Sequence, residues 1–246
     1  MSNTVLLNNV DHADLKVSTA RGEAFGDGVN QAVVVPTEFL ELQREFPILL
    51  KKDPAGVYQA VVLLGFDSGE NLYLDGDRWV SSYIPAILAR GPFTIRMASQ
   101  EDQAQSEPMI NIDLDHPAVG DEIGVPLFLK HGGNSPYLEH VAGILRRLHA
   151  GVEVRKPLFA ALEKFNLIEP VNIEGEFGEG MTFSIPGFSA VSIERLNELD
   201  AEALHQLNRA GYLYAAYMMV ASLNNISRLI QMKARKVAAQ SSGGSG

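Results

Sequence analysis

The stretch FPILLKKDPAGVYQAVVLLGF, residues 46–66, contains two apolar runs separated by the turn residues DPAG. Proline and glycine supply the backbone angles of a tight reversal, so the stretch predicts an antiparallel β-hairpin. Upstream, the β-branched run QAVVVP at 31–36 predicts another strand. Downstream, MINIDL at 109–114 alternates apolar and polar side chains, which is typical of a half-buried strand.

Two short helices are predicted between these strands. The first covers residues 37–46, where apolar side chains recur on one face. The second begins at about Arg78, after the turn residues DGD, and Pro85 should kink or restart it. The first half of the chain is therefore predicted to consist of short, mostly antiparallel strands and hairpins with two helices inserted.

The second half is predicted to be mainly helical. Helices are expected over residues 136–150 and 156–166, followed by two strands around an acidic turn. A long helix from Asp200 to about Lys236 carries two apolar stripes, which predicts burial nearly all round. The fold class is thus α+β with a long buried C-terminal helix. We interpret that helix as a central core element or as a homodimer contact through residues 204–230.

Composition excludes several classes of function. Twenty Lys and Arg against thirty Asp and Glu give a formal charge of -10, which disfavours nucleic acid or an anionic membrane as a partner. Cysteine is absent, so disulfides and thiolate chemistry are excluded. The most apolar window, 210–223, is shorter than the roughly 20 residues of a spanning helix. No export signal is recognised, so a soluble cytoplasmic protein is expected. The terminal SSGGSG, residues 241–246, resembles an artificial linker.

Motifs for nucleophilic or nucleotide chemistry are missing from the sequence. GFDSGEN at 65–71 has the order G-x-x-S-G, whereas a nucleophile elbow needs G-x-S-x-G. Neither GxxxxGK[ST] nor a GxGxxG that opens a helix is present. The sequence therefore shows no catalytic motif, and no cofactor is predicted from it.

One acidic cluster keeps a metal-dependent enzyme open as an alternative. NIDLDHPAVGDE at 111–122 brings Asp113, Asp115 and His116 together, and His131 or His140 could complete a shell for a divalent ion. On a continuous strand, however, the two aspartates point to one face and His116 to the other. Pro117 favours an end to the strand, so a strand that runs into a turn explains the cluster equally well.

Four segments resemble the bacterial SapC family: VDHADLKV at 10–17, VVVPTEFLELQREFPILLKKD at 33–53, LLGFDSGENLYLDGDRWVSSYIPAILARGPF at 63–93 and GYLYAAYMMVASLNNISRL at 211–229. The resemblance covers nearly the whole chain and implies one domain over residues 1–240. It also implies gene neighbours such as TonB-dependent receptors, cupin-like proteins and tryptophan-halogenase-like proteins. An accessory role in nutrient uptake, or in modification of a small molecule or peptide, is therefore expected. The family's surface-layer name implies a structural surface protein as a second alternative.

The resemblance implies no catalytic residue set, but it points to ligand-binding candidates. His12 and Trp79 lie in the segments that carry it, and Asp77 and Arg78 stand beside Trp79 at the expected start of a helix. The competing interpretation is a capping histidine and a core tryptophan. We therefore expect an accessory or binding protein with an unidentified protein or small-molecule partner.

Overall fold

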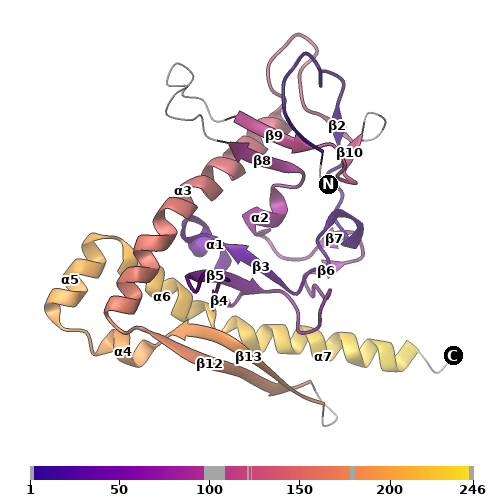
Figure 1. Cartoon of the computed structure of the whole chain (residues 1–246). Helices are drawn as coiled ribbons and strands as arrows, with labels where there is room; N and C mark the ends of the chain where they lie inside the picture. Colours follow the sequence, from indigo (N-terminus) through magenta and orange to yellow (C-terminus); the bar gives the residue numbers. More distant parts are fainter. Residues whose placement is uncertain (1–2, 97–108, 121, 123, 178–180, 244–246) are drawn as a thin grey trace. The chain divides into compact units, whose positions relative to one another are not determined.

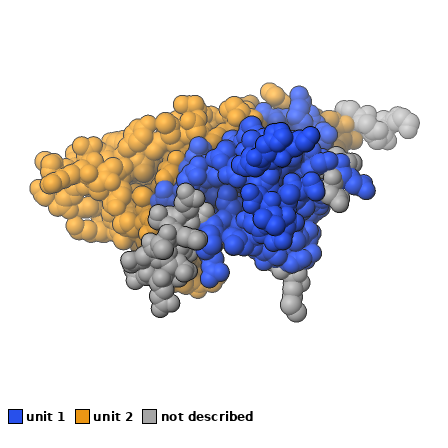
Figure 2. Space-filling view, turned by 90° about the horizontal axis from the view of Figure 1, so that it is seen from above, with its two compact units in different colours: residues 1–28, 74–80, 86–150 blue, residues 29–73, 81–85, 151–246 orange. Residues whose placement is uncertain are grey.

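The computed structural model divides the chain into two compact units, each assembled from separate stretches of sequence (Figures 1 and 2). It describes residues 3–96, 109–120, 122, 124–177 and 181–243. Unit 1 comprises residues 1–28, 74–80 and 86–150, and unit 2 comprises residues 29–73, 81–85 and 151–246. Because the two units alternate along the chain, no one position separates them. The single domain expected over residues 1–240 stays a prediction.

Unit 2 is built around a five-stranded antiparallel sheet with the order β12-β13-β4-β5-β3. Its strands are β3 (Gln31–Val34), β4 (Ile48–Lys52), β5 (Tyr58–Leu63), β12 (Ile168–Glu176) and β13 (Thr182–Val191). Strands β4 and β5 form the predicted hairpin. In its turn, Asp53 Oδ1 accepts hydrogen bonds from the backbone N–H groups of Ala55 and Val57. The α+β prediction is confirmed, with antiparallel strands in the first half and helices in the second.

Helix α6 (Tyr212–Ser222) packs against β4 and β13 of this sheet. The other helical elements of unit 2 are η2 (Pro36–Glu38), α1 (Phe39–Leu42), the second part of α3 (Pro136–Lys164), α4 (Ile193–Asn197), α5 (Ala201–Arg209) and α7 (Asn225–Gly243). The buried hydroxyl of Ser222 accepts a hydrogen bond from the backbone N–H of Ile48 at 2.9 Å. Asn225 Nδ2 donates to the carbonyl oxygen of Phe46 at 3.2 Å. These two bonds hold the junction of α6 and α7 against the start of β4.

The single helix predicted from Asp200 to Lys236 is wrong in its continuity, because the structure divides it into α5, α6 and α7. Gly211 lies between the first two with φ of 76°, a left-handed conformation that an α-helix does not contain. The prediction that this helix is buried nearly all round is also wrong, since the side chains of Tyr214 and Tyr217 are 60% and 42% exposed. Among the described residues, no helix is long and apolar enough to span a membrane.

Unit 1 contains small antiparallel sheets in the orders β1-β9-β8, β10-β2-β11 and β6-β7. Their strands are β1 (Thr4–Leu6), β2 (Lys16–Val17), β6 (Leu74–Asp75), β7 (Arg78–Trp79), β8 (Phe93–Arg96), β9 (Met109–Asp113), β10 (Val119–Gly120) and β11 (Val125–Pro126). Its helical elements are η1 (Glu23–Phe25), α2 (Ala86–Ala89) and the first part of α3 (Pro136–Lys164). Phe93, Ile112 and Leu138 are buried together in its core.

Three predicted helices differ in the structure. A helix starting at Arg78 is wrong, because Arg78 and Trp79 pair with β6 in a tight hairpin. The helix found downstream, α2, begins directly after Pro85, whose ring fits the start of a helix better than its interior. The helices predicted over 136–150 and 156–166 are one helix, α3, which continues through Pro157.

Candidate ligand-binding groove

The central sheet of unit 2 has an incomplete pairing between two of its strands. Strand β4 pairs with β5 along its whole length, from Ile48 to Lys52. In the described strands, β13 pairs with β4 at one position, Ser189 with Leu50. Lys51 and Lys52 therefore extend beyond the ladder with β13. At its end, β4 has a paired neighbour on the β5 side and none on the β13 side.

A bulge explains why β13 leaves β4 at this point. Two residues of β13, Pro186 and Gly187, lie opposite the single β12 residue Asn172. Gly187 has φ of 89°, which glycine adopts without the steric cost that a side chain brings. Pro186 has no backbone N–H for a ladder bond. Because the extra residue bends its strand, β13 turns away where the two lysines of β4 begin.

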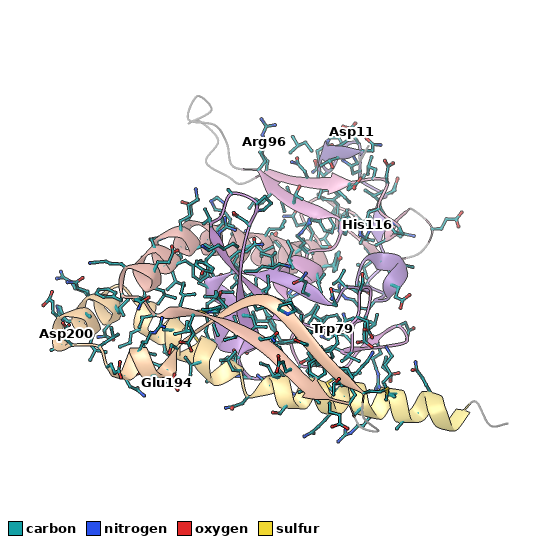
Figure 3. All side chains as sticks on the ribbon, turned by 60° about the horizontal axis from the view of Figure 1, so that its bottom comes forward. Asp11, Trp79, Arg96, His116, Glu194 and Asp200 are labelled. Atoms are coloured by element: carbon teal, nitrogen blue, oxygen red, sulfur yellow. The ribbon has the colours of Figure 1, made fainter. Side chains whose placement is uncertain are left out.

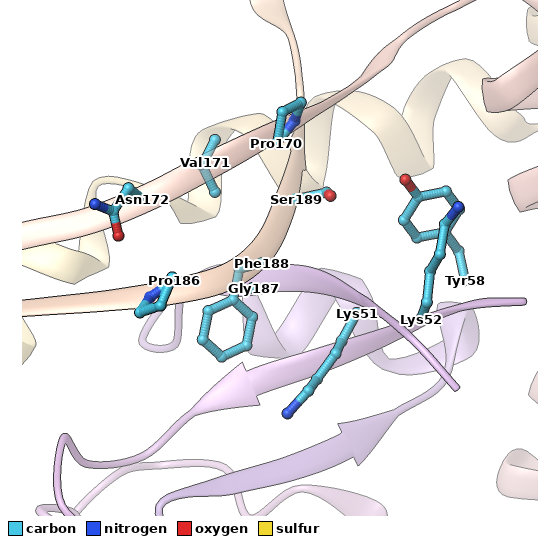
Figure 4. A pocket seen from close by; sticks show the side chains of 10 residues that line it. All are labelled: Lys51, Lys52, Tyr58, Pro170, Val171, Asn172, Pro186, Gly187, Phe188 and Ser189. Carbon is cyan, nitrogen blue, oxygen red and sulfur yellow. The ribbon is translucent and has the colours of Figure 1, made fainter. Parts of the chain in front are cut away.

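The divergence leaves a groove of about 680 Å³ between β13 and the end of β4, two inner strands of the sheet (Figure 4). It is lined by residues 51–52 of β4, Tyr58 of β5, residues 170–172 of β12 and residues 186–189 of β13. Ligand pockets commonly have volumes of about 300–1,000 Å³. The groove is therefore large enough for a small molecule or for part of a peptide.

Strand geometry places the two lysines on opposite faces of the sheet. Lys52 Nζ lies 4.9 Å from the ring centroid of Tyr58, its cross-strand partner. Lys51 Nζ lies on the other face, 5.7 Å from the ring centroid of Phe188. Figure 4 shows Lys52 beside Tyr58 and Lys51 pointing away from it. The groove thus carries one positive charge on each face of the β4 edge.

The lining of the groove is basic although the chain as a whole is acidic. Its ten described residues include two lysines and no aspartate or glutamate, in a chain of formal charge -10. Asn172 Nδ2 is held by the Ser184 hydroxyl at 3.0 Å and by the carboxylate of Glu174. The Tyr58 and Ser189 hydroxyls add neutral hydrogen-bonding groups. A negatively charged ligand with an apolar part matches this lining.

The ligand-binding candidates chosen from the sequence lie in unit 1, outside this groove. His12 Nδ1 accepts a hydrogen bond from the backbone N–H of Asn8 at 3.2 Å, so it caps a turn. Arg78 pairs with Asp75 at 3.1 Å on the exposed β6-β7 hairpin. Asp77 is exposed and Trp79 is half-buried in β7. No described contact brings His12 to this hairpin, and their role as a site stays a prediction.

The aspartates of the candidate metal cluster hold backbone groups in a turn. Strand β9 ends at Asp113, two residues before Asp115. Asp113 Oδ1 accepts a hydrogen bond from the backbone N–H of Asp115 at 3.2 Å, and Asp115 Oδ2 accepts one from Asn3 at 3.1 Å. His116 Nδ1 accepts a hydrogen bond from the backbone N–H of Ala118 at 3.1 Å. These bonds use one oxygen of each aspartate and one nitrogen of His116.

The environment of His116 favours its neutral form. Partial burial lowers the pKa of the imidazole below its ordinary value, and the charge of Arg90 acts in the same direction, against Asp113 and Asp27. Since Nδ1 accepts a hydrogen bond, the neutral ring carries its proton on Nε2. His116 is therefore a neutral histidine that shapes the turn.

The remaining candidate ligands do not complete a metal site. His131 lies in the exposed loop before α3, and His140 is exposed on α3. Among the residues that the structure describes, no group of three or more His, Asp and Glu side chains could hold a metal ion. The predicted cluster of Asp113, Asp115 and His116 with His131 or His140 is therefore not assembled.

The groove was missed because its parts are far apart in the sequence. The sequence predicts Lys51 and Lys52 only as the end of a hairpin strand, and β13 only as the strand after an acidic turn. One local signal was present, since a Pro-Gly pair inside a strand pattern indicates a bulge. Nothing local indicates that this bulge lies beside the two lysines.

Comparison with known protein families gives a match over most of the chain. Residues 7–229 match the model of the family described as SapC. No curated protein and no solved structure matches the chain significantly. The match covers most of both units, so the groove lies within the matched region.

Proposed function

The chain belongs to the SapC family, and we propose that it is an accessory or binding module whose groove between β4 and β13 takes a negatively charged ligand. The observation that carries the proposal is the lining, which contains Lys51 and Lys52 at the end of β4 and, among the described residues, no Asp or Glu. The absence of a catalytic motif in the sequence supports binding over catalysis.

Carboxylate and phosphate are the ligand groups that suit these lysines best. Each lysine presents an ammonium with three donors, and each is held near an aromatic ring that keeps it at the groove. An exposed ion pair contributes about 0.2–1 kcal/mol to the binding free energy. The two lysines therefore contribute more to the selectivity for an anionic ligand than to its affinity. Most of the affinity must come from the apolar lining and the free backbone groups of the edge.

The physiological setting rests on the family resemblance. Nutrient uptake, or modification of a small molecule or peptide, remains our proposal for the pathway that this module serves. A cytoplasmic location and a bacterial source are part of the same proposal.

A binding screen with matched variants tests the proposal. Purified protein is titrated with inorganic phosphate, succinate and acidic peptides by NMR, with uncharged analogues as references. The double change Lys51→Gln and Lys52→Gln should weaken binding about tenfold. Lys16→Gln with Lys130→Gln is the matched control, because these lysines line a hollow of about 520 Å³ in unit 1 that also contains Asp14. Equal binding by both double variants would refute the proposal.

The two alternatives have direct tests. Elemental analysis of protein purified without chelators should find well below one equivalent of metal, because the five candidate ligands are not assembled. A surface-layer protein would form large arrays, which light scattering detects. A homodimer through residues 204–230 stays our proposal, and the exposed side chains of Tyr214 and Tyr217 support it.

A further inference from the structure

We infer that the ligand of the groove is an extended acidic segment of another polypeptide, which adds a short strand to the edge of β4 at Lys52. This inference rests on the proposed function and names its ligand class. It follows from the backbone at the end of β4 and from the positions of the two lysines.

The backbone N–H and C=O groups of Lys52 point away from β5. Residues of an antiparallel pair alternate between positions that exchange hydrogen bonds and positions that face the other side. The backbone bonds from Asp53 to Val57 at 2.9 Å and from Leu63 to Pro47 at 3.3 Å set this alternation. The odd-numbered residues of β4 therefore bond β5, whereas Ile48, Leu50 and Lys52 face β13.

Strand β13 provides a partner for Leu50 and none for Lys52. In the register set by Ser189 and Leu50, the next bonding pair would join Gly187 to Lys52. The bulge at Pro186 and Gly187 takes β13 out of that register, so the described ladder stops at Leu50. The position beside Lys52 is thus a vacancy in the sheet, lined by groove residues, that an extended backbone can fill.

The side chains of the groove favour a peptide over a small anion. Successive residues of a strand point to opposite faces, as Lys51 and Lys52 do. Phe188 of β13 already lies directly opposite Lys51, so an added strand begins opposite Lys52. Its residue opposite Lys52 points toward Lys52 and Tyr58, and the next residue points to the other face, diagonal to Lys51. Two adjacent acidic residues therefore meet both lysines at once. A compact anion on one face would leave the other lysine unused.

Fluorescence anisotropy with the full chain tests the inference. The probe is a labelled peptide, acetyl-Val-Thr-Glu-Glu-Val-Thr, and its references are the Gln-Gln peptide and a peptide N-methylated at the two central residues. Lys51→Gln and Lys52→Gln should each weaken binding about threefold, and N-methylation about fivefold. Lys16→Gln with Lys130→Gln should leave it unchanged. Amide hydrogen exchange at Lys52 should slow when the peptide binds, because the N–H becomes bonded.

The outcomes separate this inference from the proposed function. If succinate or phosphate binds in a lysine-dependent manner while N-methylation has no effect, the peptide inference is wrong and anion binding stands. If the Lys52 amide exchanges equally fast with and without saturating peptide, strand addition is also refuted. If peptide, succinate and phosphate all fail to bind, both proposals are wrong.

Discussion

Replacing Lys233 by methionine should lower the free energy of unfolding of unit 2 by about 2 kcal/mol at pH 7. Lys233 on α7 donates to Glu70 Oε1 at 2.8 Å and to the carboxylate of Asp67. The side chains of Lys233 and Glu70 are 13% and 7% exposed, whereas Asp67 is 71% exposed. The substitution leaves the Glu70 carboxylate nearly buried without its main cation.

The magnitude follows from what remains around Glu70. Breaking a buried ion pair by removing one partner costs about 3–5 kcal/mol. Lys236 still lies 3.3 Å from Glu70 Oε1, and the backbone N–H of Phe66 still donates to Oε2 at 3.1 Å. These groups offset part of the loss, which leaves about 2 kcal/mol, or roughly 4–8 °C in Tm for a domain of this size.

The free energy of unfolding should depend on pH with opposite sign in the wild type and in Lys233→Met. In the wild type, burial raises the pKa of Glu70, but the bonds from Lys233, Phe66 N–H and Lys236 outweigh it, so the pKa is lowered. Glu70 therefore contributes to the free energy of unfolding above the pKa that it has in the unfolded state. This contribution is lost as pH falls through the pKa of Glu70 in the folded state. Without Lys233, burial should raise the folded pKa above the unfolded one. The variant should then regain stability as pH falls from 7 to 5.

Urea unfolding followed by circular dichroism at pH 7 and pH 5 measures both effects. Lys236→Met is the matched control, because Lys236 contacts the same carboxylate while its side chain is 46% exposed. The Lys236→Met change should lower the free energy of unfolding by less than about 1 kcal/mol. The reasoning is refuted if Lys233→Met costs no more than Lys236→Met, or if its deficit is the same at both pH values.

Three further outcomes are expected. Gly151→Ala should lower the free energy of unfolding, measured with urea, by about 1–3 kcal/mol, because the new Cβ would lie 2.4 Å from Cβ of Val35. Gly143→Ala on the same helix places its Cβ in open space, so it should raise the free energy of unfolding by up to about 1 kcal/mol. NMR titration should give His116 a pKa below its ordinary value, with the proton on Nε2; a protonated ring at pH 7 would contradict this. Tyr214→Ser with Tyr217→Ser should convert any dimer to monomer in light scattering, and an unchanged mass would place the contact elsewhere.

Local chemistry allowed much of the fold to be predicted. The DPAG turn and its flanking runs define the β4-β5 hairpin, because proline, glycine and the Asp53 side chain favour reversal within a few residues. Alternation predicted β9, and the order of motifs predicted the family. The spacing of apolar residues did not predict where a helix ends, because a single backbone angle decides that position. The apolar pattern continues through Gly211, but its left-handed φ ends the helix there.

The sequence by itself determined the class of the protein, its family and its β4-β5 and β12-β13 hairpins, since each depends on residues close in the chain or on the order of motifs. The groove was decided by tertiary structure alone. In the described strands, the backbone of Lys52 is not paired with β13, because a bulge at Gly187, more than a hundred residues later in the chain, takes β13 away from it. The pairing of distant strands is set by packing against the rest of unit 2, and no local pattern of residues contains that information.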